Sequence, residues 1–140
     1  MKKSFLFLPL LLAMLSSYAA PVITVDTVAP AFQDKHIMVI TLKKELRPGS
    51  EVTDAAKTWK LTSSQAMEIF KSVKPVSDAE LAAKFTESPA FMSGKCRVDD
   101  KNYTYEINAG DFLTLNDGQQ LTHYACYNKS LRKYFLTGPK

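Results

Sequence analysis

The sequence is short of the residues and motifs that most enzyme classes require. Its 140 residues include only two cysteines, two histidines and five glycines. The glycines are isolated, so no phosphate-binding loop or dinucleotide fingerprint occurs. There is neither a G-x-S-x-G elbow nor the D-x-D-x-D spacing of a calcium loop. We therefore expect no cofactor and no bound metal.

Zinc is the one metal whose usual ligand types are all present. The candidate ligands are His36, Cys96, His123 and Cys126. Structural zinc sites bring their ligands in closely spaced pairs, and here only His123 and Cys126 are close in sequence. Because three residues along a strand lead to the opposite face, the sequence disfavours a zinc site.

Nucleophilic and acid–base catalysis are disfavoured for similar reasons. A cysteine nucleophile needs a free thiolate beside a base, whereas an even cysteine count in an exported chain favours a disulfide. Acidic pairs exist, for instance Asp99 with Asp100 or Glu106 with Asp111. Adjacent aspartates are typical of turns, and Glu106 falls on a polar strand face. We predict no catalytic residue and a protein that is not an enzyme.

Residues 1–19 have the pattern of a secretory signal peptide. Lys2 and Lys3 precede an apolar run over residues 5–15, which is too short to span a bilayer comfortably. Small residues then suit a signal peptidase, with cleavage after Ala19 preferred to cleavage after Ala20. No cysteine follows that could carry a lipid anchor. The pattern predicts a bacterial protein of the periplasm or the exterior.

Residues 20–140 are enough for a single domain with a modest core. The formal net charge of the whole chain is +4. The predicted signal peptide carries two lysines and no acid, so only +2 remains after its removal. This charge does not indicate nucleic-acid binding. No second long apolar segment follows, so we expect no membrane association after signal removal.

Two helices with capping signatures are predicted in the first half of the domain. Thr62 and Gln65 fit a capping box, and apolar residues follow at helical spacing until Pro75. Ser77 and Glu80 repeat the capping signature before a shorter helix. We expect the two helices to form a hairpin that packs on the sheet.

Strands are predicted on both sides of these helices. From residue 91 onward apolar and polar residues alternate, which is typical of half-buried strands. Turn signals at residues 99–102 and 116–118 indicate hairpins, and Ala109-Gly110 indicates a bulge or corner. Further strands are expected at residues 21–28, 36–42 and 131–136.

A single disulfide between Cys96 and Cys126 is predicted to close the strand-rich half of the chain. The two cysteines fall on strands separated by another strand, and bridged Cα atoms lie about 4.4–6.8 Å apart. They can meet only if the sheet bends sharply near Ala109-Gly110. The predicted fold is therefore α+β: a curled antiparallel meander with a helical hairpin packed on it and one disulfide.

The aromatic and basic residues near the C-terminus could form a binding surface. Tyrosine and arginine are favoured at interface hot spots. In the alternative interpretation the aromatic rings belong to the core and the lysines form a solvated edge. The candidate partner-binding residues are Tyr124, Tyr127, Lys129, Arg132 and Lys133.

The segment from Tyr105 to Gly110 is similar to a segment found in a group of bacterial proteins. Bracketed by Cys96 and Cys126 and followed by Tyr134-Phe135, it resembles a segment of small exported bacterial proteins of unassigned biochemistry. Some of these proteins accompany interbacterial toxins as immunity proteins. The resemblance covers roughly residues 59–137 and transfers no functional residue.

The first functional prediction is a non-enzymatic periplasmic protein that binds another protein. An immunity or inhibitor protein would occlude a toxin or envelope hydrolase over about 1,200–2,000 Å² of interface. The alternative is an envelope protein that binds a small ligand or cell-wall fragment inside the curled sheet, stacking it on Tyr103 and Tyr105. A small hydrolase is the third possibility. An exposed aromatic patch would favour the first, a lined concave pocket the second, and a histidine or shifted carboxylate in that pocket the third.

Overall fold

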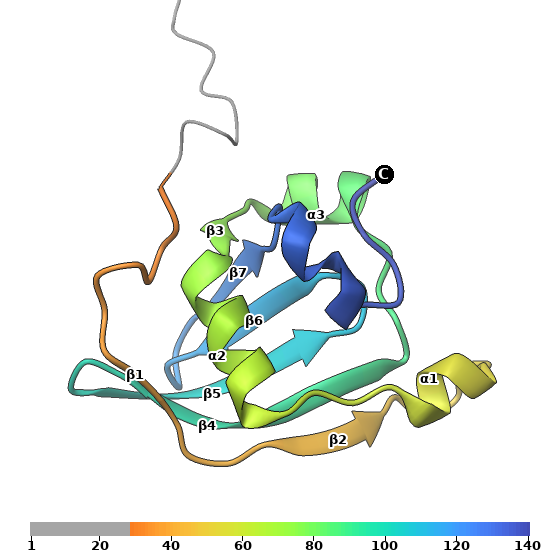
Figure 1. The fold of residues 1–140 in the computed structure, drawn as a ribbon, viewed down its shortest axis with the longest axis horizontal. Coiled ribbons are helices and arrows are strands. Elements are labelled where there is room, and N and C mark those ends of the chain that lie inside the picture. Colours follow the sequence, from red (N-terminus) through yellow and green to blue (C-terminus); the bar gives the residue numbers. More distant parts are fainter. Residues whose placement is uncertain (1–28) are drawn as a thin grey trace, which may run out of the picture.

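The computed structural model describes residues 29–140, which form an α+β fold around a curled antiparallel sheet (Figure 1). The predicted signal peptide, its cleavage at Ala19 or Ala20 and the predicted strand at residues 21–28 lie outside the described residues. Within residues 29–140, none of the helices has the length and apolar character needed to cross a membrane.

The sheet has seven strands in the order β1-β4-β5-β6-β7-β3, and β2 also pairs with β4. Strands β4 to β7 are consecutive antiparallel neighbours, which confirms the predicted meander. The strands are β1 (Ile37–Val39), β2 (Lys43–Leu46), β3 (Lys74–Pro75), β4 (Ala90–Val98), β5 (Lys101–Asn108), β6 (Phe112–Asn116) and β7 (Leu121–Ala125).

One face of this sheet carries the hydrophobic core. The apolar alternation of β4, β5 and β6 places buried side chains on this face, and α2 (Ser63–Ser72) packs its buried residues Ala66, Ile69 and Phe70 into the same cluster. The Phe70 and Tyr105 rings meet edge to face with centroids 5.3 Å apart, a favoured aromatic geometry. Tyr103 and Tyr105 therefore lie on the core side of the sheet, and each also contributes to the lining of a cavity.

Two glycines allow backbone segments to approach each other closely. Residues 40–42 cross Gly94 between β1 and β2, and a Cβ at Gly94 would overlap the Thr41 carbonyl oxygen. The Tyr105 hydroxyl donates a 2.6 Å hydrogen bond to the same oxygen. A Cβ at Gly110 would likewise overlap the carbonyl oxygen of Thr86. At both positions the absence of a side chain allows the crossing backbone segment to lie in direct contact with the glycine.

The predicted helical hairpin is wrong in its arrangement. The capping box of Thr62 and Gln65 is present, and Ser77 caps α3 (Asp78–Lys84) by accepting from the Glu80 backbone. Between the two helices, however, β3 adds to the edge of the sheet beside β7. As a result α2 covers the core face, whereas α3 flanks the opposite face.

The predicted corner at Ala109-Gly110 is a hairpin turn that reverses the chain between β5 and β6. Its register pairs Asn108 with Phe112. The buried Asn108 side chain accepts from the backbone N–H groups of Ser88 and Gly110 and donates to the Ser88 carbonyl, all within 2.8–2.9 Å. This amide thus ties the turn to the segment that enters β4.

The last predicted strand, residues 131–136, is instead the 3₁₀ helix η2 (Lys129–Tyr134). The Asn128 side chain accepts from the Ser130 N–H and begins this helix, as short polar side chains do at helix starts. The Trp59 ring N–H, just after α1 (Asp54–Thr58), donates to the Tyr134 carbonyl at 2.7 Å. The C-terminal end then runs back to α3, where the Lys140 N–H donates to the Lys84 carbonyl (Figure 1).

The predicted disulfide is wrong, because Cys96 and Cys126 are both buried free thiols. Cys96 pairs with Tyr103 near one end of β4, whereas Cys126 follows Ala125, which pairs with Phe112 at the other end of the sheet. Strands β5 and β6 lie between them. Three strand spacings amount to about 14 Å, well beyond the Cα separation that a disulfide can bridge.

We predict that the chain, isolated without added reductant, contains two free thiols. Burial raises the pKa of each thiol to about 12, so alkylation should be slow in the folded protein. Unfolding in denaturant without reductant should expose both thiols, giving two alkyl groups per chain by mass spectrometry. A chain that takes no alkyl group until it is reduced would contradict the described register.

Candidate functional site

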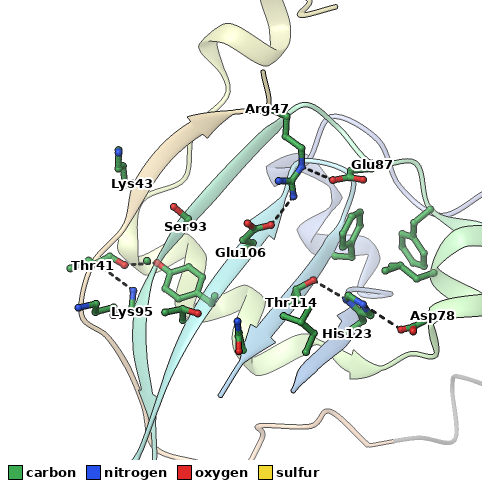
Figure 2. Close-up of a pocket in the computed structure, with 18 of the residues that line it drawn as sticks. Thr41, Lys43, Arg47, Asp78, Glu87, Ser93, Lys95, Glu106, Thr114 and His123 are labelled. Carbon is green, nitrogen blue, oxygen red and sulfur yellow. Dashed lines mark hydrogen bonds and ion pairs between the residues drawn. The ribbon is translucent and has the colours of Figure 1, made fainter. Parts of the chain in front are cut away.

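A cleft of about 850 Å³ occupies the sheet face that α2 leaves open (Figure 2). Its floor is formed by strands β4, β5, β6 and β7, and one side is bounded by β2 with Arg47. The opposite side is formed by α3. The volume lies in the range of sites that bind small molecules, about 300–1,000 Å³.

A row of polar residues crosses the floor of the cleft from strand to strand. In the sheet register Lys43 lies opposite Ser93, Ser93 opposite Glu106, Glu106 opposite Thr114, and Thr114 opposite His123. Directly opposed residues share a face of the sheet, so five neighbouring strands each contribute one polar side chain to the cleft. We call Lys43, Ser93, Glu106, Thr114 and His123 the polar row.

At one end of the cleft, Arg47 forms ion pairs with two carboxylates. Its guanidinium donates to Glu87 at 2.6 Å and to Glu106 at 2.7 Å, and Figure 2 shows it between the two carboxylates. The guanidinium carbon also lies 4.4 Å from the centroid of the Phe91 ring, within cation–π distance. These contacts orient Glu106 at the centre of the polar row.

The other end is formed by a hydroxyl, an imidazole and a carboxylate. Thr114 Oγ1 is hydrogen-bonded to His123 Nδ1 at 2.9 Å, and His123 Nε2 lies 3.3 Å from Asp78 Oδ1 at the start of α3. In the tautomer that carries its proton on Nε2, the imidazole donates to Asp78 and accepts from Thr114. The Asp78 side chain is 92% exposed, so solvent weakens this contact.

The α3 side of the cleft is apolar. Leu81, Ala82 and Phe85 line it, and the Phe85 ring meets Phe112 edge to face with centroids 6.3 Å apart. At the rim the Leu121 side chain is 59% exposed. The cleft therefore combines a polar floor with an apolar wall, which is the usual composition of a ligand site.

On the β2 side, Glu45 binds two members of the polar row. The Ser93 hydroxyl donates to Glu45 at 2.6 Å, and Lys43 lies 3.4 Å from the same carboxylate. The Ser93 hydrogen bond is the main cause of a lowered pKa of Glu45, so the carboxylate stays ionised. A second cavity of about 560 Å³ adjoins the cleft and shares Lys95, Thr104 and Asn116 with it.

The five candidate partner-binding residues do not form one surface. Tyr124 packs on Phe32 with ring centroids 4.9 Å apart. The Tyr127 ring packs on Phe85, and its hydroxyl donates to Glu80 at 2.8 Å. Both tyrosines thus serve packing. Lys129, Arg132 and Lys133 are exposed on η2.

The candidate zinc ligands lie apart. His123 lines the cleft, Cys96 and Cys126 are buried, and His36 is exposed beside Asp99 in the β4–β5 hairpin. In the part of the chain that the structure describes, no group of three or more His, Cys, Asp or Glu side chains could hold a metal ion.

The acidic pairs named from the sequence do not converge on the cleft either. Asp99 and Asp100 form the β4–β5 turn, where Asp99 has a left-handed φ of 52°. Glu106 faces the cleft, whereas Asp111 is buried outside it.

Comparison of this chain with protein-family models, with curated proteins and with solved structures finds no match. The site is therefore interpreted from its own geometry alone.

A buried carboxyl outside the cleft is the other unusual polar group. Asp111 is 1% exposed, has a left-handed φ of 77°, and neither of its carboxyl oxygens has a hydrogen-bond partner within residues 29–140. Burial raises the pKa of Asp111 to about 7, although the positive charge of Arg132 partly offsets the effect. The carboxyl is thus protonated over much of the acidic range.

We predict that Asp111 makes the domain less stable as the pH rises. Between its ordinary pKa of 3.8 and about 7, the folded state holds a proton that the unfolded state has released, so the free energy of unfolding falls as pH rises through this window. At about 1.4 kcal/mol per pKa unit, the loss is at most about 4 kcal/mol. Asp111→Asn tolerates the left-handed backbone and should remove the decline.

Urea unfolding between about pH 4 and pH 8 measures this effect. The exposed turn variant Asp100→Asn is the matched control and should keep the decline. An Asp111→Asn curve that falls with pH as steeply as that of the unmodified protein would contradict the assignment.

Proposed function

We propose that this chain is a non-enzymatic binding protein of the bacterial cell envelope, which takes a ligand into the cleft on the open face of its sheet. The observation that carries the proposal is the cleft itself: concave, about 850 Å³, and built from a polar floor and an apolar wall. The expected export of the chain places its ligand in the envelope or outside the cell.

Catalysis is the less favoured use of the same residues. Thr114, His123 and Asp78 have the composition of a nucleophilic triad. However, Thr114 lies in the middle of β6, between β5 and β7, where backbone N–H groups are used in the ladder and are not available to stabilise an oxyanion. Asp78 is also too exposed to hold the imidazole firmly. The three side chains are better suited to forming hydrogen bonds with a ligand.

The pairing of the charges in the cleft supports binding of an uncharged or weakly charged ligand. Arg47 is paired with both Glu87 and Glu106, and Lys43 is paired with Glu45, which leaves these two clusters together with one excess negative charge. A charged ligand would have to compete with these ion pairs. A polar neutral group can add hydrogen bonds to them without breaking them.

Native mass spectrometry of the mature protein, purified from the envelope of its own organism, tests this proposal. The unmodified protein should carry a non-covalent adduct of constant mass. Thr114→Trp, which fills the middle of the cleft, should lose this adduct. Lys57→Trp, on the exposed end of α1, is the matched control and should retain it. Absence of an adduct, or equal adducts on both variants, would count against ligand binding in the cleft.

A second candidate function is the binding of another protein, as an inhibitor or immunity protein would do. Its support is the set of exposed basic side chains on η2, namely Lys129, Arg132 and Lys133. This cluster would suit a partner with an acidic surface, such as a toxin or an envelope hydrolase. Because Tyr124 and Tyr127 are packed, the surface lacks the aromatic anchors typical of hot spots.

A pull-down from periplasmic extract separates this candidate from ligand binding. If η2 binds the partner, the double variant Lys129→Glu and Lys133→Glu should lose a stoichiometric protein that the unmodified chain retains. The control variant Lys57→Glu and Lys60→Glu changes the charge by the same amount elsewhere. Equal recovery of the partner by both variants would exclude η2 as its binding surface.

A further inference from the structure

We propose that the ligand of the cleft is a linear oligosaccharide that lies across the strands, along the polar row. This inference rests on the proposed function, because it names the ligand class of the same site. It is carried by three features of the cleft: the direction of the polar row, its hydrogen-bonding character and the apolar wall beside it.

The direction of the row indicates an extended ligand. The row runs perpendicular to the strands, from Lys43 on β2 to His123 on β7. Four strand spacings give it a length of about 19 Å, and Asp78 extends it onto α3. A compact ligand would contact only one or two members of the row.

The side chains of the row suit hydroxyl groups. Ser93 and Thr114 can both donate and accept, Glu106 accepts, and the imidazole of His123 can do either. A sugar hydroxyl also donates and accepts, and a glycan chain repeats such groups at regular intervals. The internal ion pairs of Glu106 and Lys43 leave the floor without a strong net charge, which matches a neutral ligand.

A peptide fits this arrangement less well. An extended peptide is usually recognised by main-chain pairing with an exposed sheet edge. Here the floor strands β4, β5 and β6 already pair with neighbours on both sides, and β7 pairs with β6 along its length and with β3 at Tyr124 and Ala125. Only side chains face the cleft, and they follow a line across the strands.

The apolar wall of the cleft also suits an oligosaccharide. Leu81 and Ala82 on α3 and Phe112 on β6 present apolar surface beside the row. A pyranose ring has polar edges and apolar C–H faces, so one chain can hydrogen-bond to the floor and bury a ring face against the wall. A uniformly apolar ligand could contact the wall but could not form hydrogen bonds with the floor.

Isothermal titration with β1,4-linked N-acetylglucosamine oligomers, from the disaccharide to the hexasaccharide, tests the inference. Affinity should rise with chain length and level off once the chain spans the row. Ser93→Ala and Thr114→Val each remove one hydroxyl and should weaken binding of the longest oligomer about three- to tenfold. Thr122→Val removes a hydroxyl from β7, opposite Leu115 of the core, and should leave the affinity unchanged. Circular dichroism shows whether each variant is folded.

The outcomes separate the inference from the proposed function. If no oligomer binds while a native adduct is still lost in Thr114→Trp, the cleft binds a ligand of another class and only the glycan assignment fails. If neither an oligomer nor an adduct is found, both fail. Binding that does not depend on chain length, or that Thr122→Val weakens as much as Thr114→Val, would overturn the placement along the polar row.

Discussion

The register of the antiparallel sheet is the constraint on which the cleft depends. A slip of one residue in any strand would turn its side chains to the opposite face, so Glu106 or Thr114 would enter the core and a buried apolar residue would face solvent. Three contacts hold the register from outside the ladder. The segment at Thr41 crosses Gly94 and accepts from the Tyr105 hydroxyl, and Asn108 ties the β5–β6 turn to Ser88.

The same constraint explains how so small a domain presents a polar site. The core face is closed by α2 and its aromatic contacts, whereas α3 covers only one side of the other face and leaves the cleft open. Polar side chains on that face are not isolated, because Arg47 joins Glu87 to Glu106 and His123 joins Thr114 to Asp78. These contacts pre-orient the side chains, which reduces the entropy lost when a ligand binds.

Much of the fold can be predicted from local sequence patterns, and the site cannot. The capping box at Thr62 and the alternation along β5 are short-range signals, and both predictions are confirmed. The disulfide and the helical hairpin depend on strand order, which local patterns do not encode. From the sequence, His123 is a candidate only as a metal ligand. Its contacts with Thr114 and Asp78 cannot be predicted locally, because they depend on β6–β7 pairing and on the position of α3. Glu106 is recognisable as a polar-face residue, but Arg47, its partner, lies 59 positions away in the sequence.

The measurement that tests this account most directly is the cross-strand NMR contact pattern of the open face. The account predicts nuclear Overhauser contacts from Glu106 to both Ser93 and Thr114, and from Thr114 to the His123 ring. Contacts of Glu106 with Leu113 in place of Thr114 would show a register shifted by one residue. That result would remove the polar row, and with it the basis for a binding cleft on this face.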